Sequence, residues 1–426
     1  MKIQTVKIDG YKNLSNVKIA LSNITALVAL NNFGKSNFLS GIDFAITFIK
    51  ANIQKKIAMM SNSNCIPMHR NLQGRNYRYE MDASTEFNNQ KYQLKYEFEF
   101  CWKNSVETDP FIVCESLKIK TADAPKFTQI IDRNCECATY RRTESGRCST
   151  TINVCPAELV VNKLAAFDDL YYSEIIKQLN NVKVYIENNL DAKVFYQPDP
   201  IIRNGFESEM ISVNNLPRII FDIKEKYPDK FELLRDVYMQ LFPNIDDLIV
   251  RKIQIDAQEP GQSGDTPYVF SEFIHFLYVR DQNFSNPINF ETMSDGAKRV
   301  FMILTKIIVS TINDVSLIAI EEPENSVHPG LFQSYIRIIS QLLDDCSVLI
   351  TSHSPYIVSY LEPEWIHVGM NRNPGIAEFF AFRGRAKKQL QSDAKRFDMS
   401  MGDYLFSLLS DSDDSLNDYL ENNTNG

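Results

Sequence analysis

Several features of membrane and secreted proteins are absent from this chain. No stretch approaches the roughly 18 consecutive apolar residues of a transmembrane helix. The N-terminus, MKIQTVKIDG, alternates like a β-strand and lacks the apolar core of a signal peptide. Of the 426 residues, 44% are hydrophobic and 23% are charged, as in ordinary globular proteins. We therefore expect a cytoplasmic protein that does not use a membrane.

An excess of positive charge is absent as well. The formal net charge is −9, which does not suit a protein whose whole surface binds nucleic acid. The chain also lacks a sustained heptad pattern, which argues against a long coiled-coil arm. DNA binding would need a local basic patch, and one cluster could supply it or could be a solvated helix face: Arg383, Arg385, Lys387, Lys388, Lys395 and Arg396.

The eight cysteines do not form a familiar zinc motif. Cys135, Cys137, Cys148 and Cys155 follow the pattern C-x-C-x10-C-x6-C, whereas structural zinc sites usually contain C-x2–4-C. We favour reduced cysteines packed in a β-rich region. A zinc site made by these four thiolates stays open as the alternative.

One segment does carry a clear chemical pattern, because it runs from an apolar strand through a short loop into a helix. Ile24 to Leu30 is an apolar run, residues 31–34 break it, and a helical pattern continues from Lys35 to about Lys55. Such a loop places the free N–H groups and the positive dipole end of a helix beside an anion. The spacing predicts a nucleotide-phosphate site made by Asn31, Asn32, Phe33, Gly34, Lys35, Ser36 and Asn37.

Within this loop, Lys35 should reach the β- and γ-phosphates, and the Ser36 hydroxyl should bind Mg²⁺. Two positions depart from the pattern G-x-x-x-x-G-K-[ST]. Ala29 replaces the first glycine and should add a methyl group where backbone and phosphate approach closely. Asn32 stands where many such loops have another glycine, and asparagine tolerates left-handed dihedral angles. A turn without a nucleotide that happens to contain GKS is the alternative.

A second apolar run, Leu317 to Ile320, ends in two acidic residues. A buried parallel strand places such residues at the carboxyl edge of its sheet, where ligands bind in open α/β folds. Glu321 would help to hold Mg²⁺, and Glu322 would orient and deprotonate the attacking water. An acidic cap on a helix near Pro329 would explain Glu324, but it does not explain two acids directly behind a strand.

A histidine follows the next expected strand. His353 comes after Ser347–Thr351, and a plausible helix at 331–343 separates that strand from the acidic one. This is the spacing of one β–α–β step. In that place His353 can hydrogen-bond the γ-phosphate or the attacking water, although a lone histidine is often structural.

A further segment, MSDGA at 293–297, begins an expected helix that continues to about Ile312. Read simply, Ser294 or Asp295 is an N-cap. A second phosphate-binding helix N-terminus in one chain nevertheless suggests that a nucleotide is sandwiched between two protomers. Each protomer would then present Ser294 and Gly296 to the nucleotide that the other protomer holds.

These segments together resemble the ABC-type ATPase heads of the SMC, RecF and OLD (overcoming-lysogenisation-defect) group. ALNNFGKSN at 29–37 looks like their Walker A, and MSDGA looks like their LSxG signature. EEPE at 321–324 with the following HP looks like Walker B plus D-loop, and TSHSP at 351–355 looks like the H-loop. The motif sequences EEPENSVHP and ITSHSPYIV are most similar to those of OLD-like ATPases and of single-head ATPases of prokaryotic defence systems.

The resemblance implies an ATPase that converts ATP and water to ADP and phosphate with Mg²⁺. Lys35 and Ser36 then bind nucleotide and metal. Glu321 takes the place of the Walker B aspartate, Glu322 is the catalytic base, and His353 is the switch histidine.

The resemblance also implies a homodimer or higher homo-oligomer, held together by ATP between two heads. Ser294 and Gly296 would contact the γ-phosphate of the partner protomer. Gln73 is the nearest candidate for the Q-loop glutamine.

For the fold, we expect an α/β P-loop ABC-type ATPase head with a mixed sheet, an antiparallel β lobe, a helical insertion and no long coiled coil. The expected parts are an ATPase core at 1–60 and 246–400, a β-rich lobe at 61–155, a helical insertion at 156–245, and an acidic, partly disordered tail at 401–426.

Three functions remain open. The first is a slow ATPase that senses a trigger and controls a separate effector, a nuclease or toxin, in antiviral defence. Too little sequence follows Tyr360 for the Toprim nuclease domain of OLD nucleases, so the effector would be another chain. The second is a RecF-like, ATP-gated DNA-repair protein. The third is an ATP-locked scaffold with negligible hydrolysis, which Ala29 favours and the Glu321–Glu322 pair opposes.

Overall fold

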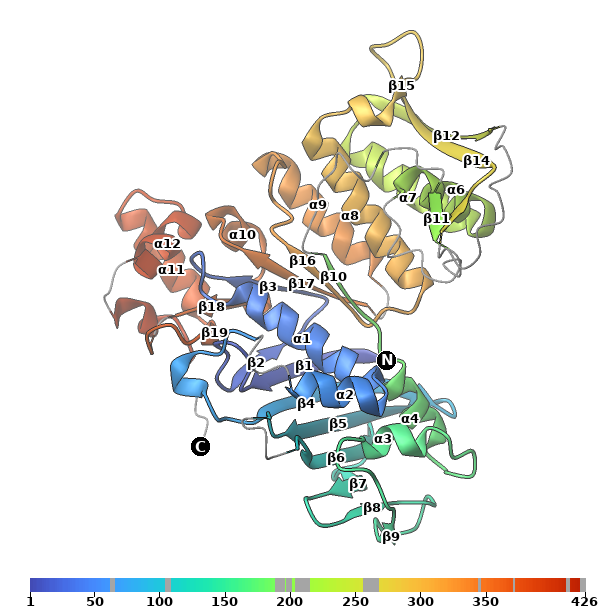
Figure 1. The fold of residues 1–426 in the computed structure, drawn as a ribbon. Coiled ribbons are helices and arrows are strands. Elements are labelled where there is room, and N and C mark those ends of the chain that lie inside the picture. Colours follow the sequence, from blue (N-terminus) through green and yellow to red (C-terminus); the bar gives the residue numbers. More distant parts are fainter. Residues whose placement is uncertain are drawn as a thin grey trace. The chain divides into compact units, whose positions relative to one another are not determined.

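The computed structural model separates the chain into two compact units, each built from segments that lie far apart in the sequence (Figure 1). Unit 1 comprises residues 1–186, 314–322 and 345–426, and unit 2 comprises residues 187–313 and 323–344. The domain boundaries expected above stay predictions. The structure describes residues 1–61, 66–103, 109–187, 196, 201–203, 215–255, 268–343, 346–370, 372–410 and 414–421.

Unit 1 contains a mixed six-stranded sheet with the order β10-β16-β17-β3-β18-β19. β16, β17, β3 and β18 run parallel, and β19 is antiparallel to β18. Every residue of β3 and β17 is buried, which explains why neither strand alternates between polar and apolar residues in the sequence. The strands are β3 (Ile24–Val28), β10 (Val184–Glu187), β16 (Leu317–Glu321), β17 (Ser347–Ser352), β18 (Ile366–Gly369) and β19 (Phe379–Ala381).

Unit 1 also contains an eight-stranded sheet with the order β2-β1-β4-β5-β6-β7-β8-β9, in which every pairing is antiparallel. Its long strands alternate buried and half-exposed residues, because one face packs on the core and the other meets water. The strands are β1 (Lys2–Asp9), β2 (Val17–Ala20), β4 (Tyr77–Phe87), β5 (Gln90–Phe100), β6 (Ile112–Thr121), β7 (Thr128–Arg133), β8 (Ala138–Tyr140) and β9 (Thr150–Thr151).

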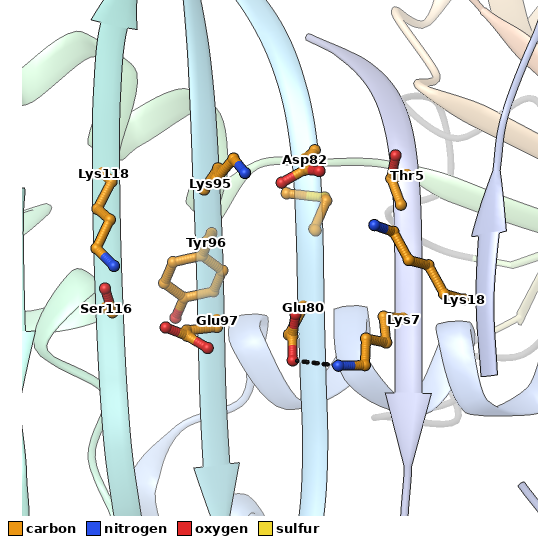
Figure 2. A pocket seen from close by; sticks show the side chains of 11 residues that line it. Thr5, Lys7, Lys18, Glu80, Asp82, Lys95, Tyr96, Glu97, Ser116 and Lys118 are labelled. Carbon is orange, nitrogen blue, oxygen red and sulfur yellow. Dashed lines mark hydrogen bonds and ion pairs between the residues drawn. The ribbon is translucent and has the colours of Figure 1, made fainter. Parts of the chain in front are cut away.

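The water-facing side of this sheet carries charged residues of both signs around a shallow pocket (Figure 2). Lys7 of β1 forms an ion pair of 3.0 Å with Glu80 of β4. The other charged side chains that line the pocket are Lys18, Asp82, Lys95, Glu97 and Lys118. This pocket lies on the eight-stranded sheet, away from the strand ends that carry the sequence motifs.

Helix α1 (Lys35–Lys50) packs against the inner face of the eight-stranded sheet. The rings of Phe48 and Phe100 stack with centroids 4.9 Å apart, and those of Phe44 and Tyr77 are 5.1 Å apart. The same core cluster includes residues of β3, β16 and β17, so α1 shares one core with both sheets. The helix that begins at Lys35 is therefore firmly anchored.

The expected helix from Lys35 to about Lys55 is two helices. α1 ends at Lys50, and α2 (Ile53–Ser61) starts after a break at residues 51–52. The Asn52 side chain accepts a hydrogen bond of 2.9 Å from the Lys55 N–H, so a capping asparagine interrupts the apolar pattern.

The end of the chain adds helices α10 (Pro355–Tyr360), α11 (Ala386–Arg396) and α12 (Met401–Ser410) to unit 1. Part of the expected disordered tail is ordered: residues 414–418 form the 3-10 helix η6, and Leu420 bridges to Phe382 just after β19. The Tyr419 hydroxyl donates a hydrogen bond of 2.8 Å to Asp393 of α11. Residues 411–413 and 422–426 lie outside the described part of the chain.

Unit 2 combines helices with short sheets. Helices α6 and α7 fall in the expected helical insertion, whose residues 188–195, 197–200 and 204–214 are not described. Two strands, β13 and β14, follow each other closely between Tyr268 and Asp281. The elements are β11 (Ile201–Arg203), α6 (Leu216–Lys226), α7 (Pro228–Leu241), β12 (Ile245–Gln254), β13 (Tyr268–Phe270), β14 (Phe273–Asp281), β15 (Ile288–Asn289), α8 (Asp295–Ile312) and α9 (Pro329–Leu342).

Two general findings concern the described residues only. No helix among them is both long enough and apolar enough to span a membrane. The cysteines among them are free thiols, and no group of three or more His, Cys, Asp or Glu residues is placed to hold a metal ion. The zinc alternative for the four clustered cysteines therefore gains no support from their positions.

Candidate functional site

The candidate site lies at one edge of the six-stranded sheet. The register pairs Glu321 of β16 with Thr351 of β17, and Ser352 of β17 with Val28 of β3. Parallel strands end at the same edge, so the residues that follow them come together there. These residues are Glu322, His353 and the loop that begins at Ala29.

Two of the expected catalytic residues are in direct contact. His353 Nδ1 lies 2.7 Å from Glu322 Oε1, and both side chains remain partly exposed to solvent. The Glu322 N–H donates a hydrogen bond of 2.9 Å to the Thr351 carbonyl. The φ angle of Glu322 is 48°, a left-handed conformation that non-glycine residues rarely adopt. Strained backbone of this kind is concentrated at functional sites, where the surrounding structure fixes it.

Lys35 is buried, with 7% of its surface exposed, at the start of α1. Its ammonium group donates hydrogen bonds of 2.8 Å to the Ala29 carbonyl and 2.9 Å to the Leu30 carbonyl. The Lys35 side chain therefore crosses the inside of the loop. Its ammonium group holds the first two carbonyls of the loop, those of Ala29 and Leu30, pointing inward. Within the described residues, no side chain caps the first turn of α1 at Gly34, and that turn carries no acidic residue. Its N–H groups suit an anion.

The conformation of the loop explains its glycine and one of its asparagines. Gly34 has a φ of 120°, and Asn32 has a φ of 60°. A Cβ atom at Gly34 would lie 2.7 Å from the Ala377 Cβ and 2.9 Å from Asn13 Oδ1, so only glycine fits. The expected tolerance of Asn32 for left-handed dihedral angles is used here. Asn31, Asn32 and Ser36 are exposed, whereas the Phe33 ring is buried and contacts Phe379 edge-on.

Ala29, which replaces the first glycine of the loop pattern, packs inside the protein. Its side chain is fully buried. A Cβ atom on Gly369 of β18 would lie only 2.6 Å from the Ala29 Cβ. The methyl group thus packs against the one residue of β18 that has no side chain, and the loop accommodates alanine without narrowing its solvent side.

Ser36 and Glu321 were the expected metal ligands. Ser36 is exposed and Glu321 is half-buried, at the same sheet edge. Mg²⁺ usually takes one or two protein oxygens and completes its octahedron with phosphate and water. A hydroxyl and a carboxylate therefore fit a metal that arrives with a nucleotide, rather than one held by a protein cage.

Ser294 and Gly296 belong to unit 2, so their expected role across a dimer stays a prediction. The Ser294 hydroxyl accepts a hydrogen bond of 3.3 Å from the Ala297 N–H and caps α8, as the simple interpretation requires. A Cβ atom at Gly296 would lie 2.3 Å from the Ser326 carbonyl oxygen. Glycine is therefore needed at this position for packing, whatever it binds.

The remaining expectations concern less specific residues. Gln73 is exposed directly after the 3-10 helix η2 (Arg70–Leu72), and its Q-loop role stays a prediction. In the basic stretch, Lys387 pairs with Glu362 at 3.3 Å and Arg396 pairs with Asp393 at 3.2 Å. Acidic neighbours thus offset part of the positive charge on α11.

One residue that the sequence motifs did not indicate touches the phosphate loop directly. Asn13, in the turn between β1 and β2, hydrogen-bonds both Phe33 and Asn37. Two strands, β2 and β3, lie between this turn and the loop in the sequence, so only the fold reveals the contact.

Comparison with known protein families identifies the family of the chain. Residues 1–358 match the family model AAA_15, described as an AAA ATPase domain. The chain belongs to this family. An ATPase domain needs a site for the phosphates of ATP, and the loop before α1 is the candidate for it. No protein of curated function matches the chain.

Solved structures show only distant likeness. An SMC head bound to the C-winged helix domain of ScpA is 12% identical with a TM-score of 0.49, and the match covers 91% of this chain and 100% of that one. The SMC head domain from Thermotoga maritima gives 11% and 0.43, over 90% and 100%. The recombination mediator RecF gives 11% and 0.41, over 89% and 98%. Likeness at this level carries no functional argument.

Proposed function

We propose that this protein binds ATP with Mg²⁺ at the edge of the six-stranded sheet and hydrolyses it slowly to ADP and phosphate. The observation that carries the proposal is the convergence of three strand ends: the loop after β3 holds Lys35, and the ends of β16 and β17 hold the contacting pair Glu322 and His353. Membership of an ATPase domain family supports it.

In this mechanism the loop and α1 bind the phosphates through backbone N–H groups and Lys35. The Glu322 carboxylate accepts a proton from the attacking water and so makes it a better nucleophile. His353, in contact with Glu322, fixes the direction of the carboxylate and can hydrogen-bond the water or the γ-phosphate. When bound, Mg²⁺ neutralises part of the charge on the phosphates.

The direct test compares wild type with Glu322→Gln. The amide keeps the size of the side chain but cannot accept the proton, so ATP binding should persist while hydrolysis falls by roughly 100-fold or more. Glu362→Gln is the matched control, because Glu362 is an exposed partner of Lys387 outside the site. Equal hydrolysis rates in wild type and Glu322→Gln would overturn the assignment.

We further propose that ATP holds two copies head-to-tail, and that closure of the heads controls a separate effector chain, a nuclease or toxin, in antiviral defence. The similarity of the motif sequences EEPENSVHP and ITSHSPYIV to those of OLD-like ATPases supports this role. ATP can shift the balance between open and closed heads only by as much as it binds one of these two states more tightly than the other. Expression of the chain alone should be harmless, and phage protection should require the neighbouring gene. DNA repair without any such gene would favour the RecF-like alternative.

A further inference from the structure

Asn13 connects three separate segments of unit 1. Its Nδ2 donates hydrogen bonds of 3.2 Å to the Phe33 carbonyl and 3.1 Å to the Gly375 carbonyl. Its Oδ1 accepts a hydrogen bond of 2.8 Å from Asn37 Nδ2. Its own carbonyl accepts a hydrogen bond of 3.0 Å from the Ala377 N–H. One half-buried amide thus links the phosphate loop, the first turn of α1 and the segment before β19.

The contact with Phe33 bears on the direction of a loop amide. In a trans peptide the C=O and the N–H point in opposite directions. No peptide bond of the described chain is cis, so a hydrogen bond from Asn13 to the Phe33 carbonyl turns the Gly34 N–H away from Asn13. Gly34 itself packs against Asn13 and Ala377. Asn13 therefore supports the loop from one side, and the Gly34 N–H points to the other side.

We propose that Asn13 is a positioning residue of the nucleotide site, which holds the Phe33–Gly34 peptide and Asn37 in the orientation that binds the phosphates. The inference rests on the proposed ATP site and deepens it. An amide is the required chemistry, because the side chain must donate to two carbonyls and accept from one amide group at the same time. Alanine offers neither function, and aspartate offers only the acceptor.

The first measurement is the dissociation constant for ATP with Mg²⁺, together with kcat and KM. Asn13→Ala should weaken ATP binding by roughly tenfold, the equivalent of about one net hydrogen bond. The value of KM should rise in parallel while kcat changes little, because Asn13 does not touch the reacting atoms. Asn23→Ala is the matched control, since Asn23 is exposed and its side chain bonds only Lys2 in the described contacts.

The second measurement uses pH to separate positioning from general destabilisation. In Asn13→Asp the ionised carboxylate would face the carbonyl oxygens of Phe33 and Gly375 and could not donate to either. Protonation restores one donor. The ratio of dissociation constants, Asn13→Asp over wild type, should therefore fall as the pH is lowered from 8 to about 5.5, because those two carbonyls favour the neutral acid. The same ratio for Asn13→Ala should stay constant.

The outcomes separate this inference from the function on which it rests. If wild type binds no ATP, both are overturned. If wild type binds ATP and both Asn13 variants bind it equally well, only the positioning role is overturned. If the variants lose binding in proportion to a loss of folded protein in circular dichroism, and the aspartate variant shows no recovery at low pH, Asn13 is merely structural and the inference is again overturned.

Discussion

His353 at the end of β17 and Glu322 at the end of β16 are joined by a contact of 2.7 Å between Nδ1 and Oε1. The two residues lie on neighbouring parallel strands, so a short hydrogen bond fixes the direction of the carboxylate expected to activate water. Glu322 also has an unfavourable backbone φ of 48°, which the strand end maintains. The pair is thus the clearest candidate for a catalytic role at this sheet edge.

We expect His353→Ala to bind ATP with nearly unchanged affinity and to hydrolyse it roughly 10- to 100-fold more slowly. The reason is that the carboxylate loses its partner, whereas the phosphate loop stays intact. Single-turnover hydrolysis together with equilibrium binding of ATP measures the two effects separately. A full rate in this variant would mean that the contact has no role in turnover.

Ala29→Gly should leave ATP affinity and kcat within about twofold of wild type. The Ala29 methyl group packs against Gly369 instead of the phosphate side of the loop, so its removal opens no space for the nucleotide. The lost burial and the added backbone freedom should lower the free energy of unfolding by roughly 1 kcal/mol. Steady-state kinetics and chemical denaturation test both parts, and a large gain in kcat would contradict the packing argument.

Ser294→Arg should block assembly of two protomers with ATP while leaving ATP binding to the single protomer. Ser294→Ala is the matched control, since it removes only the N-cap hydrogen bond to Ala297, worth about 1 kcal/mol, and adds no bulk. Analytical ultracentrifugation with and without ATP distinguishes the two variants. Normal ATP-dependent association of the arginine variant would exclude Ser294 from the interface.

Lys56 should make stability depend on pH above neutrality. This lysine is 1% exposed, and burial lowers its pKa from 10.5 to about 8, although Glu115 and Glu158 oppose the shift. Between these two values the unfolded chain binds more protons than the folded chain, so the contribution of Lys56 to stability rises with pH from about 8 to about 10.5. The total is roughly 3 kcal/mol.

Lys56→Met should remove this rise, and subtraction of the two stability curves cancels the other titrating groups. Urea denaturation at several pH values between 7 and 10.5 provides the curves. The variant also loses the hydrogen bonds that Lys56 donates to Asn162 and to the Ala51 carbonyl, so the slope of the difference curve is the readout and not its absolute level. Parallel curves for the two proteins would contradict the shifted pKa.

The sequence predicts the strand ends well because those strands are buried on both faces. β3 and β16 each contain an apolar run, β17 has the apolar centre Val348–Ile350, and a chemically distinctive residue follows each strand. Local pattern cannot predict contacts made across the fold. Asn13 contacts Phe33 and Gly375, and the Ala29 methyl group contacts Gly369, although each pair of residues lies far apart or in different elements of the chain.

Helix and strand breaks were harder to predict, since one capping residue or one turn divides a continuous apolar pattern. Asn52 separates α1 from α2 in this way. Composition alone also did not indicate which part of the expected acidic tail is ordered. Residues 414–421 are rich in acidic and polar side chains, yet Leu416, Tyr419 and Leu420 are buried. A few apolar residues placed at the right spacing are enough to order a polar segment.

This ordered end has a consequence for the six-stranded sheet. The Glu421 N–H bonds the Ala381 carbonyl at 2.9 Å, and the Arg383 N–H bonds the Tyr419 carbonyl at 3.0 Å. These bonds occupy backbone groups at and just after the outermost strand, β19. Open strand edges recruit strands from other molecules and lead to aggregation. The last described residues therefore cover one end of the outer edge of β19, and we expect a chain shortened before residue 414 to aggregate more readily.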